Sequence, residues 1–167
     1  GEPTVWLVWG PLMVCGAAYV VSGQVSNTII WLSAIYGLGP MTVLFGKHTD
    51  KLPEDKRKCV YTLPVILGER SSRYATLLAW LAQYTLITSA VLFGQLHWAL
   101  LLVWIALPKF LKNSKIFLVP RPTEKPSSLP EEVWPLYLVA FAFDHNKAFS
   151  GLFFLGLIAS VVLPKFI

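Results

Sequence analysis

Long apolar runs separated by short polar segments dominate the chain. Four of these runs cover residues 4–21, 28–45, 74–93 and 98–118. Each is about as long as the helix of roughly 20 residues that crosses the hydrocarbon core of a bilayer. The pattern therefore predicts four membrane-spanning helices joined by short turns, with a proline in the first run, Pro11, expected to kink its helix.

A fifth apolar run, residues 133–163, is too long for one ordinary span. The polar tetrapeptide "DHNK", residues 144–147, divides it. We expect an interfacial helix before this break and a final span from about Phe149. The whole pattern predicts an all-α fold, a polytopic transmembrane helix bundle of about five spans that forms a single membrane domain over residues 1–167.

Composition agrees with a membrane protein. The chain is 55% hydrophobic and only 14% charged, whereas a soluble domain carries roughly a quarter charged residues. The formal net charge of +5 does not indicate nucleic-acid binding, because the bases gather at the ends of apolar runs.

The charges also predict an orientation. Residues 47–73 hold seven Lys and Arg against four acids, and residues 109–125 hold five against one, while the turns at 22–27 and 94–97 hold none of either sign. Basic loops stay on the cytoplasmic side. We therefore expect an integral protein of a bacterial inner membrane or its organellar equivalent. A charged loop, 46–73, and a Pro-rich linker, 119–131, are expected on the cytoplasmic side of that membrane.

The charged loop has two interpretations. In the first, it forms a short surface helix that begins near Pro53, with Glu54 and Asp55 at its positive end and bases further along. In the second, Asp50, Glu54 and Asp55 gather on one side and bind Mg²⁺, because clustered carboxylates hold this ion well when a phosphate supplies the remaining oxygens.

The second interpretation also gives the bases a role. Lys47, Lys51 and Arg57 would then bind a diphosphate beside the metal. A water-side cluster of acids and bases next to an apolar bundle suits a lipid diphosphate whose tail lies in the membrane. Spacing alone leaves both interpretations open.

The segment "DKLPEDKRKCVYTLPVILGE" resembles the second aspartate motif of the UbiA family of intramembrane prenyltransferases. In that family an aspartate pair precedes a basic stretch and a Thr-Leu-Pro-Val run. Asp55 and the run from Thr62 to Gly68 fall in matching places. "HNKAFSGLFFLGL", residues 145–157, is similar to the start of the family's last helix. The resemblance implies the back half of a nine-helix fold.

The resemblance also implies an activity. A UbiA-like prenyltransferase moves an isoprenoid from its diphosphate to an aromatic or related lipid-soluble acceptor, with Mg²⁺ as cofactor, as in quinone, chlorophyll or haem-type lipid biosynthesis. Asp50, Glu54 and Asp55 would then be the catalytic metal ligands. The family's first motif, Asn-Asp-x-x-Asp, has no match in these 167 residues. We therefore expect a partial chain that is inactive alone.

A different class of function stays open. The chain would then be a non-catalytic half-UbiA membrane subunit that packs in a larger photosynthetic or respiratory complex and binds lipid, quinone or pigment. Other membrane helices would cover the face that carries Gly37 and Gly39, because small residues mark close helix contacts. A haem or chlorophyll held by the same-side pair His48 and His145 is a further alternative. Four phenylalanines would face an isoprenoid tail or lipid: Phe141, Phe143, Phe153 and Phe154.

Overall fold

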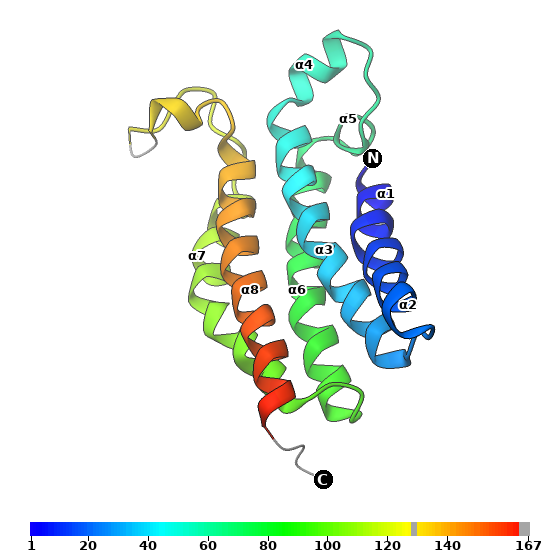
Figure 1. The fold of residues 1–167 in the computed structure, drawn as a ribbon. Coiled ribbons are helices and arrows are strands. Elements are labelled where there is room, and N and C mark those ends of the chain that lie inside the picture. Colours follow the sequence, from blue (N-terminus) through cyan, green and yellow to red (C-terminus); the bar gives the residue numbers. More distant parts are fainter. Residues whose placement is uncertain (128–129, 164–167) are drawn as a thin grey trace.

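All regular elements in the described part of the chain are helices. The structure, a computed structural model, describes residues 1–127 and 130–163. The long helices run alternately up and down and form an antiparallel bundle (Figure 1). The charged loop, residues 46–73, is called the charged segment from here on. The N-terminus lies at the same end of the bundle as this segment, and the described chain ends at the opposite end (Figure 1). The all-α prediction is confirmed.

The first span consists of three helical segments without a break: α1 (Glu2–Leu7), η1 (Val8–Cys15) and α2 (Gly16–Ser22). The middle segment, η1, is π-helical and contains Pro11. Proline lacks an N–H and its ring crowds the preceding turn, and the wider π-helical turn accommodates both effects. The helix ends at Gly23, whose φ of 70° suits glycine.

The second span is longer than its apolar run. Helix α3 (Asn27–Asp50) begins after Ser26, whose hydroxyl accepts the Ile29 N–H, as N-capping serines do. It continues five residues beyond the predicted end at Phe45. The first acid and the first bases of the charged segment are therefore held on a helix that belongs to the bundle.

The remainder of the charged segment is also largely helical. Two short helices follow, α4 (Leu52–Arg57) and α5 (Leu63–Leu67). Helix α4 has Pro53 in its first turn, Glu54 and Asp55 near its N-terminus and bases in its last turn. The surface-helix hypothesis is confirmed in these details, and the predicted loop 46–73 is helical at both of its ends.

Three further helical segments complete the middle of the chain: α6 (Glu69–Leu92), η2 (Trp98–Ala106) and α7 (Leu107–Leu118). The predicted run 98–118 is thus helical throughout. Its second half carries three exposed lysines, Lys109, Lys112 and Lys115. Four helical stretches in the described chain are long and apolar enough to cross a membrane, namely 2–22, 27–50, 69–92 and 137–162. The prediction of about five spans is confirmed for these four.

The last helix corrects the sequence analysis. After a short turn, η3 (Glu131–Val133), helix α8 runs unbroken from Tyr137 to Val162. The polar residues 144–147 do not interrupt it. Asp144 accepts hydrogen bonds from Lys109 at 2.7 Å and from Asn113 at 3.1 Å, both on α7. Because donors on α7 satisfy the Asp144 carboxylate, α8 can continue through this polar stretch.

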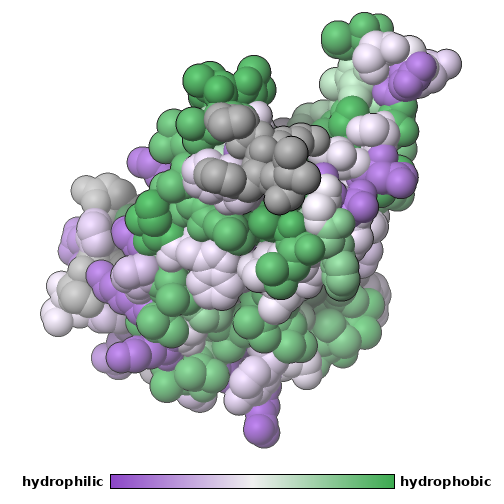
Figure 2. All heavy atoms as spheres, turned by 90° about the horizontal axis from the view of Figure 1, so that it is seen from below, coloured by the Kyte–Doolittle hydropathy of each residue, from purple (hydrophilic) through white to green (hydrophobic). Residues whose placement is uncertain are grey.

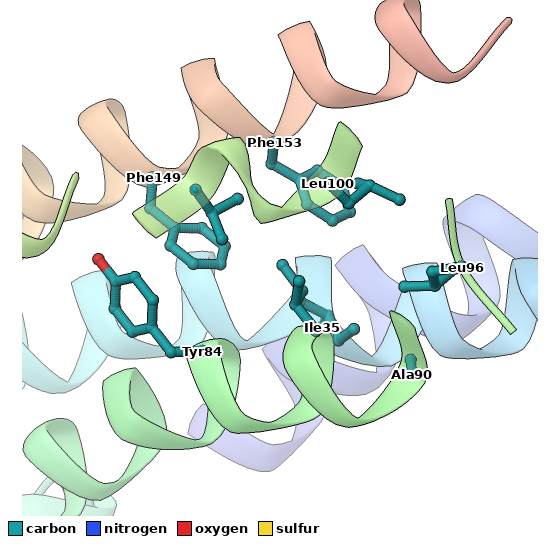
Figure 3. Packing of buried hydrophobic residues seen from close by; sticks show 9 residues of the cluster. Ile35, Tyr84, Ala90, Leu96, Leu100, Phe149 and Phe153 are labelled. Carbon is teal, nitrogen blue, oxygen red and sulfur yellow. The ribbon is translucent and has the colours of Figure 1, made fainter. Parts of the chain in front are cut away.

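The core lies between α3, α6, η2 and α8. Figure 3 shows Tyr84 of α6, Phe149 and Phe153 of α8 and Leu100 of η2 turned toward Ile35 of α3. A second buried cluster lies nearer the charged end, around Trp80, Phe117 and Leu138. Figure 2 looks onto the end away from the charged segment, where hydrophobic residues cover much of the surface.

Small residues bring the helices close within this one chain. A Cβ on Gly37 would lie 2.6 Å from the Trp6 carbonyl oxygen and 3.0 Å from Gly10 Cα. A Cβ on Gly39 would overlap the side-chain amide of Asn146 on α8. The face that carries Gly37 and Gly39 is therefore covered by the chain's own helices, and the expectation that other membrane helices cover it was wrong.

Candidate functional site: an apolar groove below the charged segment

An apolar groove of about 470 Å³ lies between the first span and α8, with α3 as its floor. That volume is in the range of small-molecule sites. Tyr36, Pro40, Val43 and Lys47 recur at helical spacing along one face of α3. The remaining lining residues come from the neighbouring helices or the same face: Val5, Trp9, Leu44, Phe143 and Asn146.

Lys47 stands at the end of this groove that faces the charged segment. It is seven residues beyond Pro40, which places it roughly 10 Å further along α3. Its side chain is exposed and makes no ion pair with any other described residue. The groove therefore combines apolar walls with one available positive charge at its polar end.

Phe143 is the one predicted phenylalanine that lines the groove. Phe153 is buried in the core, and Phe154 is 63% exposed. Phe141 packs its ring edge against Tyr137 at a centroid distance of 5.2 Å. Because α8 places successive side chains about 100° apart, only one of the four reaches the groove.

The three predicted metal ligands do not come together. Asp50 is buried and accepts bonds from the backbone of α8. Glu54 accepts a hydrogen bond from Lys58 at 2.6 Å, and this contact holds the pKa of the Glu54 carboxyl below its ordinary value. The carboxylate oxygen Oδ2 of Asp55 lies 3.5 Å from the Thr62 hydroxyl.

This arrangement does not fit a magnesium ion bound by all three carboxylates. Among residues 1–127 and 130–163, no three His, Cys, Asp or Glu side chains gather in a way that could hold a metal ion. Mg²⁺ needs near-octahedral oxygen ligands at about 2.0–2.1 Å, and the oxygens of Asp50 already accept bonds from N–H groups. Magnesium binding by this chain stays a prediction.

The predicted diphosphate-binding bases are also distributed. Lys47 lines the groove, whereas Lys51 and Arg57 do not. Lys51 precedes the first turn of α4, and Arg57 is exposed in its last turn. Helix α4 rises above the bundle (Figure 1). Lys47 is thus the base that the structure joins to an apolar site.

Asp50 belongs to a network that the sequence analysis did not foresee. Its Oδ1 accepts the Leu138 N–H at 2.9 Å and the Arg121 Nε–H at 3.1 Å, and its Oδ2 accepts the Val139 N–H at 2.9 Å. Arg121 lies in the predicted Pro-rich linker. Its Nη2 also donates to the Pro135 carbonyl at 2.8 Å, and its guanidinium stacks 4.8 Å from the Trp134 ring centroid.

Two residues at the start of α6 extend this network. Glu69 accepts the Arg121 backbone N–H at 2.8 Å and lies 3.1 Å from Arg73 Nε. Arg73 Nη1 donates to the Phe117 carbonyl at 2.8 Å and to the Val119 carbonyl at 2.5 Å, at the end of α7. A signal was present in the sequence: both arginines adjoin apolar runs, where an unpaired charge is costly.

Both histidines of the haem or chlorophyll alternative have other partners. His145 is fully buried inside the bundle, where its Nε2 lies 3.2 Å from the Tyr84 hydroxyl and its ring lies tilted against Trp80 at a centroid distance of 4.4 Å. His48 Nδ1 lies 2.8 Å from Glu2. Each histidine of the predicted pair is thus engaged within the chain itself.

Comparison with known protein families assigns most of the chain to one family. A scan against protein families matches residues 1–130 to the UbiA prenyltransferase family. Neither the curated proteins nor the solved structures gave a match. The family match covers more than half of the chain, including the groove-lining faces of the first span and α3 and the whole charged segment. This chain of antiparallel membrane-spanning helices therefore belongs to the UbiA prenyltransferase family.

Proposed function

We propose that the chain binds an isoprenoid diphosphate for prenyl transfer to a lipid-soluble acceptor. The observation that carries the proposal is the groove: apolar walls on three helices, with Lys47 at the end nearest the charged segment. The isoprenoid chain lies along the walls, where its burial is favourable. Its diphosphate lies at Lys47, where an ammonium group attracts phosphate oxygens.

The proposed transfer breaks the bond between the first isoprenoid carbon and the diphosphate oxygen. The electron pair leaves with the diphosphate, the carbon bonds to an aromatic or related acceptor, and the acceptor loses a proton. Lys47 would stabilise the negative charge that grows on the leaving group. Apolar side chains such as Val43 and Phe143 would exclude water from the electron-poor carbon.

We also propose that the charged end of the bundle faces the cytoplasm. Support comes from the basic residues, which concentrate at the end where the charged segment lies. Single cysteines introduced at Gln24 and Ser127, both exposed, should be labelled from opposite sides of the membrane. Labelling of both from one side would contradict this orientation.

The alternative function is a non-catalytic membrane subunit. One observation favours it: the carboxylates that resemble the family's second motif are occupied separately and do not form a metal cluster. The two functions differ in turnover. Binding of an isoprenoid diphosphate followed by transfer of its isoprenoid group to an acceptor supports the enzyme hypothesis. Binding without transfer in the native membrane assembly supports the subunit hypothesis.

Binding of geranylgeranyl diphosphate to the purified chain in nanodiscs tests the proposal. We expect Lys47→Met to weaken binding about tenfold, because about 1.4 kcal/mol of charge-assisted contact is lost. Val43→Trp should weaken it at least as much by filling the groove. Lys112→Met, which removes an exposed lysine from α7, is the matched control.

Geranylgeraniol, which lacks the diphosphate, separates the two effects. Lys47→Met should leave its binding unchanged, while Val43→Trp should still weaken it. Equal effects of Lys47→Met and Lys112→Met on the diphosphate would show that the chain attracts it only through its overall charge.

A further inference from the structure

Asp50 joins the ends of two membrane-spanning helices. Its side chain is fully buried, and both carboxylate oxygens accept backbone N–H groups from the first turn of α8. The first N–H groups of a helix have no partner within the helix, and a carboxylate there also meets the positive end of the helix dipole. The last residue of α3 thus caps the N-terminus of α8.

A second contact fixes the same two helices one turn earlier. A Cβ on Gly46 would lie 2.9 Å from Val139 Cα and 3.0 Å from Val139 N. The backbones of α3 and α8 therefore touch at this point. Because α3 forms the floor of the groove and Phe143 of α8 lines one of its walls, the contact fixes that wall against the floor at the groove mouth, next to Lys47.

Arg121 strengthens the connection between α3 and α8 by pairing with Asp50. We call the paired side chains of Asp50 and Arg121 the clamp. Arg121 pairs with Asp50 through Nε and with the Pro135 carbonyl through Nη2. Its main chain is held by Glu69 at the start of α6. The chain between α7 and α8 is thereby fastened across the charged end, and the Asp50 carboxylate gains a third donor.

We infer that Asp50 is a positioning residue that holds the groove mouth, and that it is not a metal ligand. A metal ion at Asp50 would have to displace the two α8 N–H groups or Arg121 from a buried carboxylate, and each displaced buried group would lose its partner. The resemblance to the second motif assigns Asp50 the role of a metal ligand. We assign it instead the structural role of holding α3 and α8 together. The inference rests on the proposed function only in taking the groove as the isoprenoid site.

Spin labels across the groove mouth test the inference without any ligand. The labelled cysteines replace Lys47 and Phe143, in a chain whose native cysteines are removed by Cys15→Ala and Cys59→Ser. We expect Asp50→Asn to broaden the distance distribution or shift it to longer distances, because the amide presents an N–H to an N–H of α8. The melting temperature should fall by several degrees. Glu54→Gln, which alters an exposed acid in α4, should change neither quantity.

Two further measurements separate the inference from its rivals. Mn²⁺ alone serves as the metal probe, and its affinity should be the same for Asp50→Asn and the parent chain. Arg121→Gln should leave the label distance largely unchanged but speed cleavage after the exposed Glu124 by a glutamate-specific protease several-fold, because the α8 cap remains while the connecting segment is released.

The outcomes are distinct. A tenfold loss of Mn²⁺ affinity in Asp50→Asn with an unchanged label distance would overturn the inference in favour of a metal ligand. A lower melting temperature with an unchanged label distance would also overturn it, because Asp50 would then contribute only ordinary stability. Failure of geranylgeranyl diphosphate to bind the parent chain would reject the proposed function and leave the clamp standing.

Discussion

At the scale of single residues, the buried charges near the charged end satisfy the ends of helices. Asp50 accepts the first N–H groups of α8, and Arg73 donates to the last carbonyls of α7. An acid at an N-terminus and a base at a C-terminus both match the helix dipole. These contacts explain how charged side chains are buried beside an apolar bundle without large cost.

Arg73→Gln should therefore destabilise the protein. Arg73 is 5% exposed, and its loss leaves the Phe117 and Val119 carbonyls without their charged donor. We expect a loss of about 2–3 kcal/mol, measured by unfolding in mixed detergent and SDS. Arg70→Gln is the matched control, since Arg70 is exposed on the same helix. Similar losses for both variants would contradict the capping role of Arg73.

At the scale of helices, packing depends on glycine pairs. Gly37 of α3 and Gly10 of η1 cross so closely that neither has room for a methyl group. The obstructing atoms belong to the backbone and cannot move aside as a side chain would. The position of the first span, and with it one wall of the groove, is set at this crossing.

Gly37→Ala should push the first span away from α3. We expect a loss of about 1–3 kcal/mol, typical of overpacking, together with weaker binding of the isoprenoid diphosphate. Gly16→Ala is the control, because a Cβ on Gly16 meets nothing within 4 Å. If the two variants are equally stable in the same unfolding assay, the crossing does not position the span.

Helix existence could be predicted from the sequence, and helix ends could not. Hydrophobic runs predicted every long helix because lipid-facing and core-facing residues are both apolar. The predicted break at 144–147 was wrong because Lys109 of another helix pairs with the charge of Asp144 and Asn113 donates a hydrogen bond to it. No local sequence pattern reveals these partners. For the same reason α3 extends to Asp50, whose partners are 71 or more residues away along the chain.

The candidate site shows the same division. The charged segment was found from composition and resemblance, and Lys47 was among the predicted residues. The groove was not foreseen, because Trp9, Tyr36 and Phe143 come from three separate helices and share no sequence pattern. Arg121 was assigned to a linker because its partners, Asp50 and Glu69, lie on other elements.

At the scale of the whole molecule, apolar and charged side chains occupy different parts of the bundle. The groove walls are apolar, and the charged segment and the Asp50–Arg121 clamp lie at one end (Figure 1). A ligand with a long apolar chain and an anionic head matches this division. We therefore expect such a ligand to occupy the groove with its head at Lys47.

Photolabelling can locate the ligand in the protein. The purified chain in nanodiscs is irradiated with geranylgeranyl diphosphate that carries a diazirine on its chain, and labelled peptides are sequenced. We expect labels on groove residues such as Trp9, Tyr36 and Phe143, and we expect excess unlabelled geranylgeranyl diphosphate to remove them. Labels confined to the outer faces of α6 and α7, or labels that the unlabelled diphosphate does not remove, would contradict this expectation.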